Sequence, residues 1–170
     1  MKPIFLARCA LFSALMCICA WISIPMGNLS FTLQSFALLL ALFVLGGKGA
    51  TVSVAVYLLL GIVGIPVFSG FRGGFSTLLG VTGGYLWGFL LACLVFWGIT
   101  AFFGEKTKIY AGITAMVSVY ICGTIWFMVY APGGLLPILA QSVLPYLLPD
   151  AVKFLLAFSL SGKLKKLLPA

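Results

Sequence analysis

The sequence predicts an all-α integral membrane protein, a bundle of six transmembrane helices forming a single membrane-embedded domain over residues 1–170. Hydrophobic residues make up 64% of the 170-residue chain and charged residues only 7%, and its mean hydropathy is +1.27. A soluble fold of this length cannot bury so much apolar surface. Long apolar runs, punctuated by Gly and Pro, leave room for about five to seven crossings of about 20 residues each.

Six apolar runs are expected to form the helices, and they cover residues 4–24, 33–45, 50–65, 82–103, 108–130 and 150–164. The first run is interrupted by Arg8, and no signal-peptide cleavage site follows it, so it is kept as a helix. Gly46, Gly47 and Gly49 favour a tight turn between the second and third runs over one continuous helix. Two glycines open the fourth run, a charged loop precedes the fifth, and Pro149 suits the first turn of the sixth.

Positively charged residues predict the orientation of these helices, because Lys and Arg concentrate in the cytoplasmic loops of membrane proteins. With six crossings and both termini cytoplasmic, Arg72 lies in an outside loop. The rule then places eight cations inside: Lys2, Arg8, Lys48, Lys106, Lys108, Lys163, Lys165 and Lys166. The sequence therefore predicts a multi-pass protein of the cell membrane, surrounded by lipid.

The second, third and sixth runs are shorter than a membrane is thick. They contain 13 to 16 residues, or about 20–24 Å of helix, against a hydrocarbon core of about 30 Å. Irregular backbone is not tolerated against lipid. The outside segments 25–32, 66–81 and 131–149 are therefore expected to fold back over the bundle and to enclose a ligand pocket that opens outward.

Composition argues against several classes of function. The chain has no His and two acids, Asp150 and Glu105, which the topology places on opposite sides of the membrane. Paired-carboxylate catalysis, nucleophilic catalysis and a metal site therefore lack the residues they need, so no enzyme is expected. No P-loop surrounds Lys48. The net charge of +8 is dispersed between apolar runs, which does not favour nucleic-acid binding.

Asp150 and Lys153 are the leading candidates for a binding site. They lie three residues apart at the start of the sixth run, so their side chains share one helix face. Ionisable groups inside a membrane are costly and usually line ligand paths. The positive end of the helix dipole would also stabilise Asp150 as an anion. The alternative is an ion pair that only neutralises itself, or a Lys that reaches the interface.

The start of the fourth run is a second candidate region. Thr82, Gly83, Gly84 and Tyr85 combine unpaired helix N–H groups, close backbone approach, and a flat ring with a hydroxyl. The alternative is close helix packing, since glycines recur every fourth residue from Gly80.

Four further residues are weaker candidates. Arg72 suits an anionic ligand group but also solvent or a lipid headgroup, and Gln34 suits a polar ligand or loop backbone. Ala10 and Ala14 form a small-residue step on which a partner helix could dock, or which could serve internal packing.

Three stretches, taken in order, resemble one family. They are FTLQS at residues 31–35, GGFSTLLGVTGGYLWGF at 73–89 and LPYLLPDAVK at 144–153. The chain resembles the BioY family, the biotin-specific substrate-binding S components of energy-coupling factor (ECF) transporters. Val81 departs from the family's usual Pro, and Leu148 and Pro149 replace its usual Pro-Gly.

The resemblance implies a six-helix fold, an outward-facing biotin pocket and a docking ridge at Ala10 and Ala14 for a transmembrane coupling protein (T component). That protein joins two cytoplasmic ATPases, so ATP is used by partner subunits and this chain needs no cofactor. Asp150 would accept a ureido N–H of biotin, and Lys153 would donate to the ureido oxygen or fix Asp150. Tyr85 would pack on the ring.

The partner of the biotin carboxylate stays open between Arg72, Thr82 and the N–H groups of the fourth helix. Two alternative functions also remain at this stage. One is an S component for another small vitamin, and the other is a small oligomeric channel or assembly subunit.

Overall fold

The computed structural model describes residues 3–26, 29–131 and 134–167. Lys2, which the charge rule assigned to the inside, lies outside these residues. The elements follow one another as α1 Pro3–Trp21, β1 Ser23–Met26, β2 Leu29–Thr32, α2 Gln34–Ile62, α3 Phe75–Leu79, α4 Gly83–Phe103, the 3-10 turn η1 Glu105–Thr107, α5 Lys108–Tyr130, α6 Leu135–Ser142 and α7 Leu144–Leu167.

The fold is mostly helical, as the sequence predicts, and within the described residues five helices are long and apolar enough to cross a membrane: α1, α2, α4, α5 and α7. The bounds of α4 and α5 agree with the predicted runs to within one residue. Large apolar side chains remain exposed along α5 and α7, including Ile125, Val129 and Leu155. Such a surface is stable only when lipid covers it.

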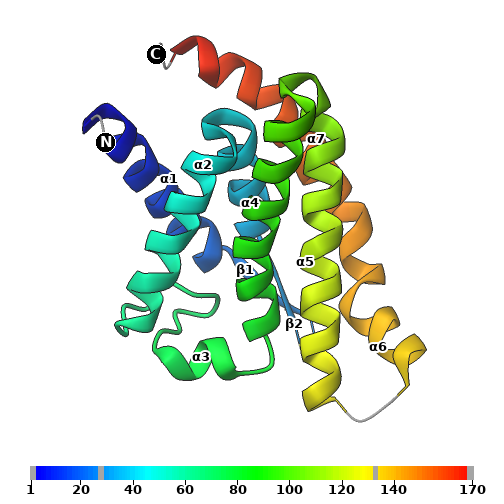
Figure 1. The fold of residues 1–170 in the computed structure, drawn as a ribbon. Helices are drawn as coiled ribbons and strands as arrows, with labels where there is room; N and C mark the ends of the chain where they lie inside the picture. Colours follow the sequence, from blue (N-terminus) through cyan, green and yellow to red (C-terminus); the bar gives the residue numbers. More distant parts are fainter. Residues whose placement is uncertain (1–2, 27–28, 132–133, 168–170) are drawn as a thin grey trace.

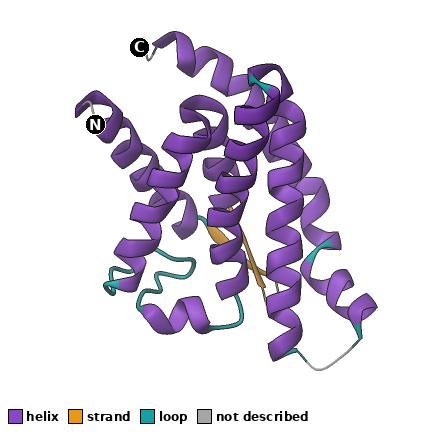
Figure 2. Ribbon diagram, viewed as in Figure 1, coloured by secondary structure: helices purple, strands orange, loops and turns teal. Residues whose placement is uncertain are grey.

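The all-α prediction missed a short antiparallel hairpin. Strands β1 and β2 pair with Ile24 opposite Phe31 and lie among the helices (orange in Figure 2). The predicted first helix, 4–24, is therefore too long, because α1 ends at Trp21 and the next residues enter β1. The short helices α3 and α6 were also missed, and both lie in segments expected to be loops.

Helix α2 consists of two helical segments joined at a non-helical residue. Gly46 interrupts it with φ 73° and ψ 176°. In a straight helix, Gln34 and Tyr57 would stand about 35 Å apart at 1.5 Å per residue. Instead, Gln34 Nε2 donates to the Tyr57 hydroxyl. The chain therefore reverses at Gly46 into two antiparallel arms, residues 34–45 and 47–62, near the predicted turn.

The prediction for the start of the last helix is wrong. Helix α7 begins at Leu144, so Pro149 lies inside it and not in its first turn. The earlier start rests on the carbonyl of Val143, which accepts from the N–H groups of Tyr146 and Leu147 at 3.0 and 3.2 Å. Pro145 occupies an early position that needs no N–H partner. Asp150 is consequently beyond the reach of the helix dipole, and α7, with 24 residues, is not short.

Close helix packing depends on glycine and on an aromatic cluster. A Cβ on Gly84 or Gly88 of α4 would lie 2.1 Å from Trp126 Cβ or 3.2 Å from Val119 Cα of α5. Phe43 of α2 meets Phe96 of α4 and Phe154 of α7 edge-on, with ring centroids 6.1 and 5.3 Å apart. These contacts hold α2, α4, α5 and α7 together around one core.

The two ends of the bundle differ. The start of α1, the end of α7, the reversal in α2 and the α4–α5 connection all lie at one end (Figure 1). Helices α3 and α6 lie at the other end (Figure 1). Within the described residues, the cations that the charge rule placed together therefore gather at the first end, and α3 and α6, from two of the segments predicted to fold over the bundle, lie at the second.

The reversal in α2 yields a first prediction. Gly46→Ala is expected to lower the free energy of unfolding by about 1–3 kcal/mol, because its backbone angles suit glycine almost exclusively. Gly98→Ala is the control, since a Cβ there meets nothing within 4 Å and Gly98 is helical. That change should stabilise slightly. Unfolding in mixed detergent micelles measures the change in stability for both variants. Equal changes would contradict the inference that a side chain at position 46 strains the backbone.

Candidate functional site

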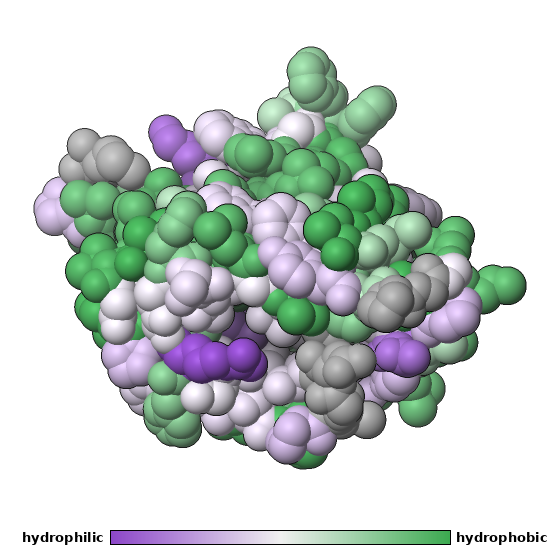
Figure 3. Space-filling model, turned by 90° about the horizontal axis from the view of Figure 1, so that it is seen from below, coloured by the Kyte–Doolittle hydropathy of each residue, from purple (hydrophilic) through white to green (hydrophobic). Residues whose placement is uncertain are grey.

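A cavity opens at the end of the bundle that carries α3 and α6. Seen from that end, the surface is hollowed beside strongly hydrophilic atoms (Figure 3). The cavity measures about 830 Å³ when the open space at its mouth is included. Its walls come from β2, from the helices α2 to α7, and from the segments on either side of α3.

The buried Asp150–Lys153 ion pair forms one end of this cavity. Lys153 Nζ lies 2.8 Å from Asp150 Oδ1, and the side chains are only 7% and 12% exposed. Because both residues sit on α7 at positions i and i+3, the helix itself brings them together. The predicted shared face is therefore observed, although it lies in the second turn of the helix and not at its start.

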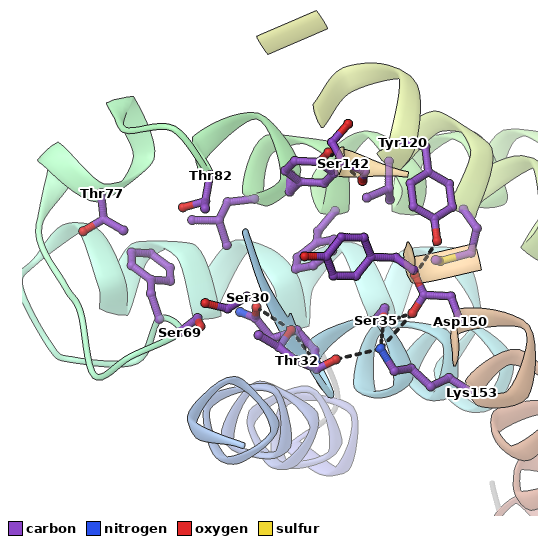
Figure 4. A pocket seen from close by; sticks show the side chains of 18 of the residues that line it. Ser30, Thr32, Ser35, Ser69, Thr77, Thr82, Tyr120, Ser142, Asp150 and Lys153 are labelled. Carbon is purple, nitrogen blue, oxygen red and sulfur yellow. Dashed lines mark hydrogen bonds and ion pairs between the residues drawn. The ribbon is translucent and has the colours of Figure 1, made fainter. Parts of the chain in front are cut away.

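Lys153 uses all three of its N–H donors within the protein. Besides Asp150, its Nζ donates to the Thr32 carbonyl oxygen at 2.7 Å and to Ser35 Oγ at 3.0 Å (Figure 4). The ammonium also lies 4.0 Å from the centre of the Phe31 ring, an attractive cation–π distance. This saturation fixes the ammonium in place and leaves Asp150 as the more accessible polar group of the pair.

Asp150 is held from three directions. Oδ1 accepts from Ser35 Oγ at 2.8 Å as well as from Lys153, and Oδ2 accepts from the Tyr120 hydroxyl (Figure 4). A carboxylate offers about four lone-pair directions, so Asp150 can accept a further hydrogen bond from a ligand. Contacts from α2, α5 and α7 fix the orientation of the Asp150 carboxylate before any ligand binds.

Part of the cavity lining is apolar. It consists of Phe68, Leu86, Phe89, Met116 and Val119. Phe68 comes from the segment after α2, and the others come from facing positions of α4 and α5. An apolar slot with a few polar groups at its ends is the usual form of a site for a small organic ligand.

Arg72 marks the other side of the cavity. It is exposed, lines the cavity, and its Nε donates to the Ser69 carbonyl oxygen at 3.1 Å. Thr82, the residue that precedes α4, lines the cavity too. The site therefore has a neutralised ion pair in its interior and an exposed cation on another wall.

Gln34 and Tyr85 also line the cavity, but their polar atoms have protein partners. The Gln34 amide accepts from Thr32 Oγ1 at 3.1 Å and donates to Tyr57. The Tyr85 hydroxyl donates to the Ser142 carbonyl oxygen at 3.2 Å. Gln34 thus shapes the wall through hydrogen bonds within the protein, while the ring of Tyr85 remains part of the cavity surface.

Gly83 and Gly84 are not among the residues that line the cavity. A Cβ at Gly83 would lie 1.8 Å from the Leu78 carbonyl oxygen, and one at Gly84 would lie 2.1 Å from Trp126. Both glycines thus serve close packing, the alternative that their spacing offered. The departures at Val81 and Leu148 do not line the cavity either.

Ala10 and Ala14 lie on an exposed face of α1. The side of this helix that packs against the bundle includes Cys9, Ser13 and Met16, and Ser13 Oγ donates to the Ser53 carbonyl oxygen at 2.8 Å. Internal packing therefore does not account for the two alanines. The face they form is open to a partner or to lipid.

Several residues of the site were not predicted from the sequence. Tyr120, Ser35 and the Thr32 carbonyl oxygen complete the shell around the ion pair, and Phe31 supplies the cation–π contact. The FTLQS stretch contains Ser35, Thr32 and Phe31. The motif therefore marks this part of the chain, but it does not show that these residues contact Asp150 and Lys153. Tyr120 lies in the middle of an apolar run, and no local pattern distinguishes it.

Comparisons with known proteins place the chain in a family. The model of the BioY family matches residues 1–170. The chain belongs to the BioY family. It is 38% identical to a Thermotoga maritima protein named biotin transporter BioY, over 95% of this chain and 96% of that protein. It is 35% identical to a Pyrococcus horikoshii protein named probable biotin transporter BioY, with 97% and 98% covered.

A solved structure has the same fold. It is described as the S-component for biotin from an ECF-type ABC transporter, and it superposes with a TM-score of 0.85 at 26% identity, covering 95% of this chain and 90% of the other. These relatives are transporters and not enzymes, in agreement with the prediction from composition.

The ion pair yields a second prediction. Lys153→Met is expected to lower the free energy of unfolding by about 3–5 kcal/mol, because it leaves the buried Asp150 without its cation. Lys108→Met is the matched control: it breaks another i,i+3 pair, but its partner Glu105 is 72% exposed, so the loss should stay below about 1 kcal/mol. Equilibrium unfolding in mixed micelles measures both variants.

A double variant sharpens this test. Asp150→Asn in the Lys153→Met background removes the stranded charge, so part of the lost stability should return. If Lys153→Met were no more harmful than Lys108→Met, the ion pair would not be the structural centre of the site.

Proposed function

We propose that this chain is the biotin-binding S component of an ECF-type importer in the plasma membrane. It captures biotin from the outside and delivers it inward. The observation that carries the proposal is the cavity that joins a buried ion pair, in which Asp150 can accept one more hydrogen bond, to an apolar slot and an exposed arginine. Membership of the BioY family and the fold shared with a biotin S-component support it.

The proposed topology has six crossings, with both termini in the cytoplasm and the cavity facing outward. The two arms of α2 count as separate crossings because the chain reverses at Gly46. The cations at the end of the bundle where α1 begins and α7 ends support a cytoplasmic position for that end. The hairpin, α3 and α6 then form the outward-facing cover of the cavity.

The fused ring of biotin is proposed to lie in the apolar slot, with its ureido group toward Asp150. A ureido group is neutral and carries N–H donors, which suit the accepting carboxylate. Of the two roles that remained open for Lys153, its saturated donors favour the fixing of Asp150. Tyr85 is proposed to contact the ring.

The carboxylate of biotin is proposed to pair with Arg72. Nε of this side chain is engaged by the Ser69 carbonyl oxygen, and the two terminal nitrogens of a guanidinium carry four more donors in a fixed fork. Arg72 therefore suits a planar carboxylate better than Thr82 or the start of α4, which provide neutral donors.

Import requires energy that this chain does not supply. A transmembrane coupling protein and two ATPases are proposed as its partners, with the exposed face at Ala10 and Ala14 as the docking ridge on α1. ATP is used by those subunits, and no cofactor is proposed for the chain itself.

The third prediction concerns the ligand. Biotin is expected to copurify with the chain in mild detergent, and Asp150→Asn should weaken its binding about 10- to 100-fold, since a hydrogen bond to a buried charge is lost. Mass spectrometry of retained small molecules and titration calorimetry measure this. Glu105→Gln, which changes the other acid of the chain, should leave binding unchanged.

Two results would contradict the proposal. Retention of a different vitamin in the presence of biotin would assign another substrate to the same scaffold. Solute or ion flux through the chain alone in liposomes, without partner subunits, would favour a channel.

The fourth prediction concerns Arg72. Arg72→Gln should weaken biotin binding about tenfold and change the binding of biotin amide, which has no charge on its tail, by less than about twofold. Arg8→Gln, the same substitution at the opposite end of the bundle, is the control. Equal losses for both ligands would show that Arg72 does not pair with the carboxylate and would favour Thr82 or the N–H groups of α4.

A further inference from the structure

Trp21, the last residue of α1, contacts the segment that carries Arg72 at two points. Its indole Nε1 donates to the Pro66 carbonyl oxygen at 2.8 Å. Its ring also stacks on Phe71, with centroids 5.3 Å apart and planes inclined by 21°. One side chain therefore connects the end of α1 to a segment about 45 to 50 residues away in sequence.

Phe71 has an unusual backbone conformation. Among the residues that the structure describes, it is the one non-glycine residue with a positive φ, at 57°. Bulky residues are rare there because the conformation costs free energy. Phe71 is also 63% exposed, so burial in the core does not compensate for that cost. The ring of Phe71 is instead stacked on Trp21 at the surface.

The opposite side of the same turn is anchored in the core. Phe68 is 1% exposed, and its ring meets Tyr57 edge-on at 5.4 Å. Its backbone N–H donates to the Arg72 carbonyl oxygen at 2.9 Å. Arg72 is therefore joined through its backbone to a core anchor at Phe68 and directly follows Phe71, which contacts Trp21. Only the second of these contacts is at the surface.

We propose that Trp21 and Phe71 are positioning residues for Arg72. Their stack, together with the bond from Trp21 to Pro66, holds the turn so that the guanidinium stays at the cavity wall and retains an acidic ligand. Neither residue lines the cavity, so both act through Arg72. The choice of biotin as the ligand in the test rests on the proposed function, whereas the placement of the turn does not.

Three variants separate the contribution of the indole hydrogen bond from that of the stacked rings. Trp21→Phe removes the indole donor and keeps a ring, and Trp21→Leu removes both. Phe71→Gly removes the stack but adopts a positive φ freely, so a loss in this variant does not come from backbone strain, and agreement with Trp21→Leu assigns it to the stack. Trp97→Leu on α4 is the control, because Trp97 and Trp21 are 41% and 40% exposed.

The first measurement is the affinity for biotin and for biotin amide. Trp21→Leu and Phe71→Gly should weaken biotin about three- to tenfold, the range expected for one aromatic pair or one hydrogen bond. Trp21→Phe should have a smaller effect, and biotin amide and Trp97→Leu should change by less than about twofold. In an Arg72→Gln background, Trp21→Leu should cause no further loss.

The second measurement needs no ligand. Hydrogen–deuterium exchange of residues 66–74 should be faster in Trp21→Leu and Phe71→Gly than in the unmodified chain or in Trp97→Leu. Unchanged exchange there, equal losses for both ligands, or full additivity with Arg72→Gln would overturn the proposal. Failure of the unmodified chain to bind biotin would instead count against the proposed function, and the exchange experiment would still decide the role of Trp21.

Discussion

The buried ion pair between Asp150 and Lys153 is the interaction on which the rest of the site depends. Two charges removed from water are costly unless each is paired and hydrogen-bonded. Here the pair meets that condition by drawing β2, the start of α2, and α5 onto α7. The same contacts that satisfy the charges therefore define one end of the cavity, so folding and the formation of the site cannot be separated.

Prediction from sequence succeeded where a property is local and failed where it depends on distant contacts. Hydropathy locates α4 and α5 to within a residue, and the spacing of Asp150 and Lys153 places them on one helix face. The start of α7 was misjudged because Pro149 lies inside the helix, where a proline usually breaks a helix but is tolerated in membrane-spanning ones. Tyr120 and the β1–β2 hairpin depend on tertiary contacts that no local pattern records.

The glycines of α4 show how one pattern can have two meanings. Close approach of backbone to a ligand and close approach of two helices both require a missing Cβ, so spacing alone does not distinguish them. The structure assigns Gly84 and Gly88 to the contact with α5. The packed α4–α5 pair supplies an apolar wall of the cavity, which is lined by Leu86, Phe89, Met116 and Val119.

The distribution of charge in the cavity limits the kind of ligand it suits. At the interior end, Lys153 cancels the charge of Asp150, so a charged group placed there would meet no net opposite charge and would lose its hydration. A neutral group with N–H donors loses less and gains a fixed acceptor. At Arg72 the situation is reversed, because an exposed cation favours an anionic group and can recruit it from solution. A molecule with a neutral polar head, an apolar middle and an acidic tail matches all three zones, and the hydrogen bonds at each end set its direction.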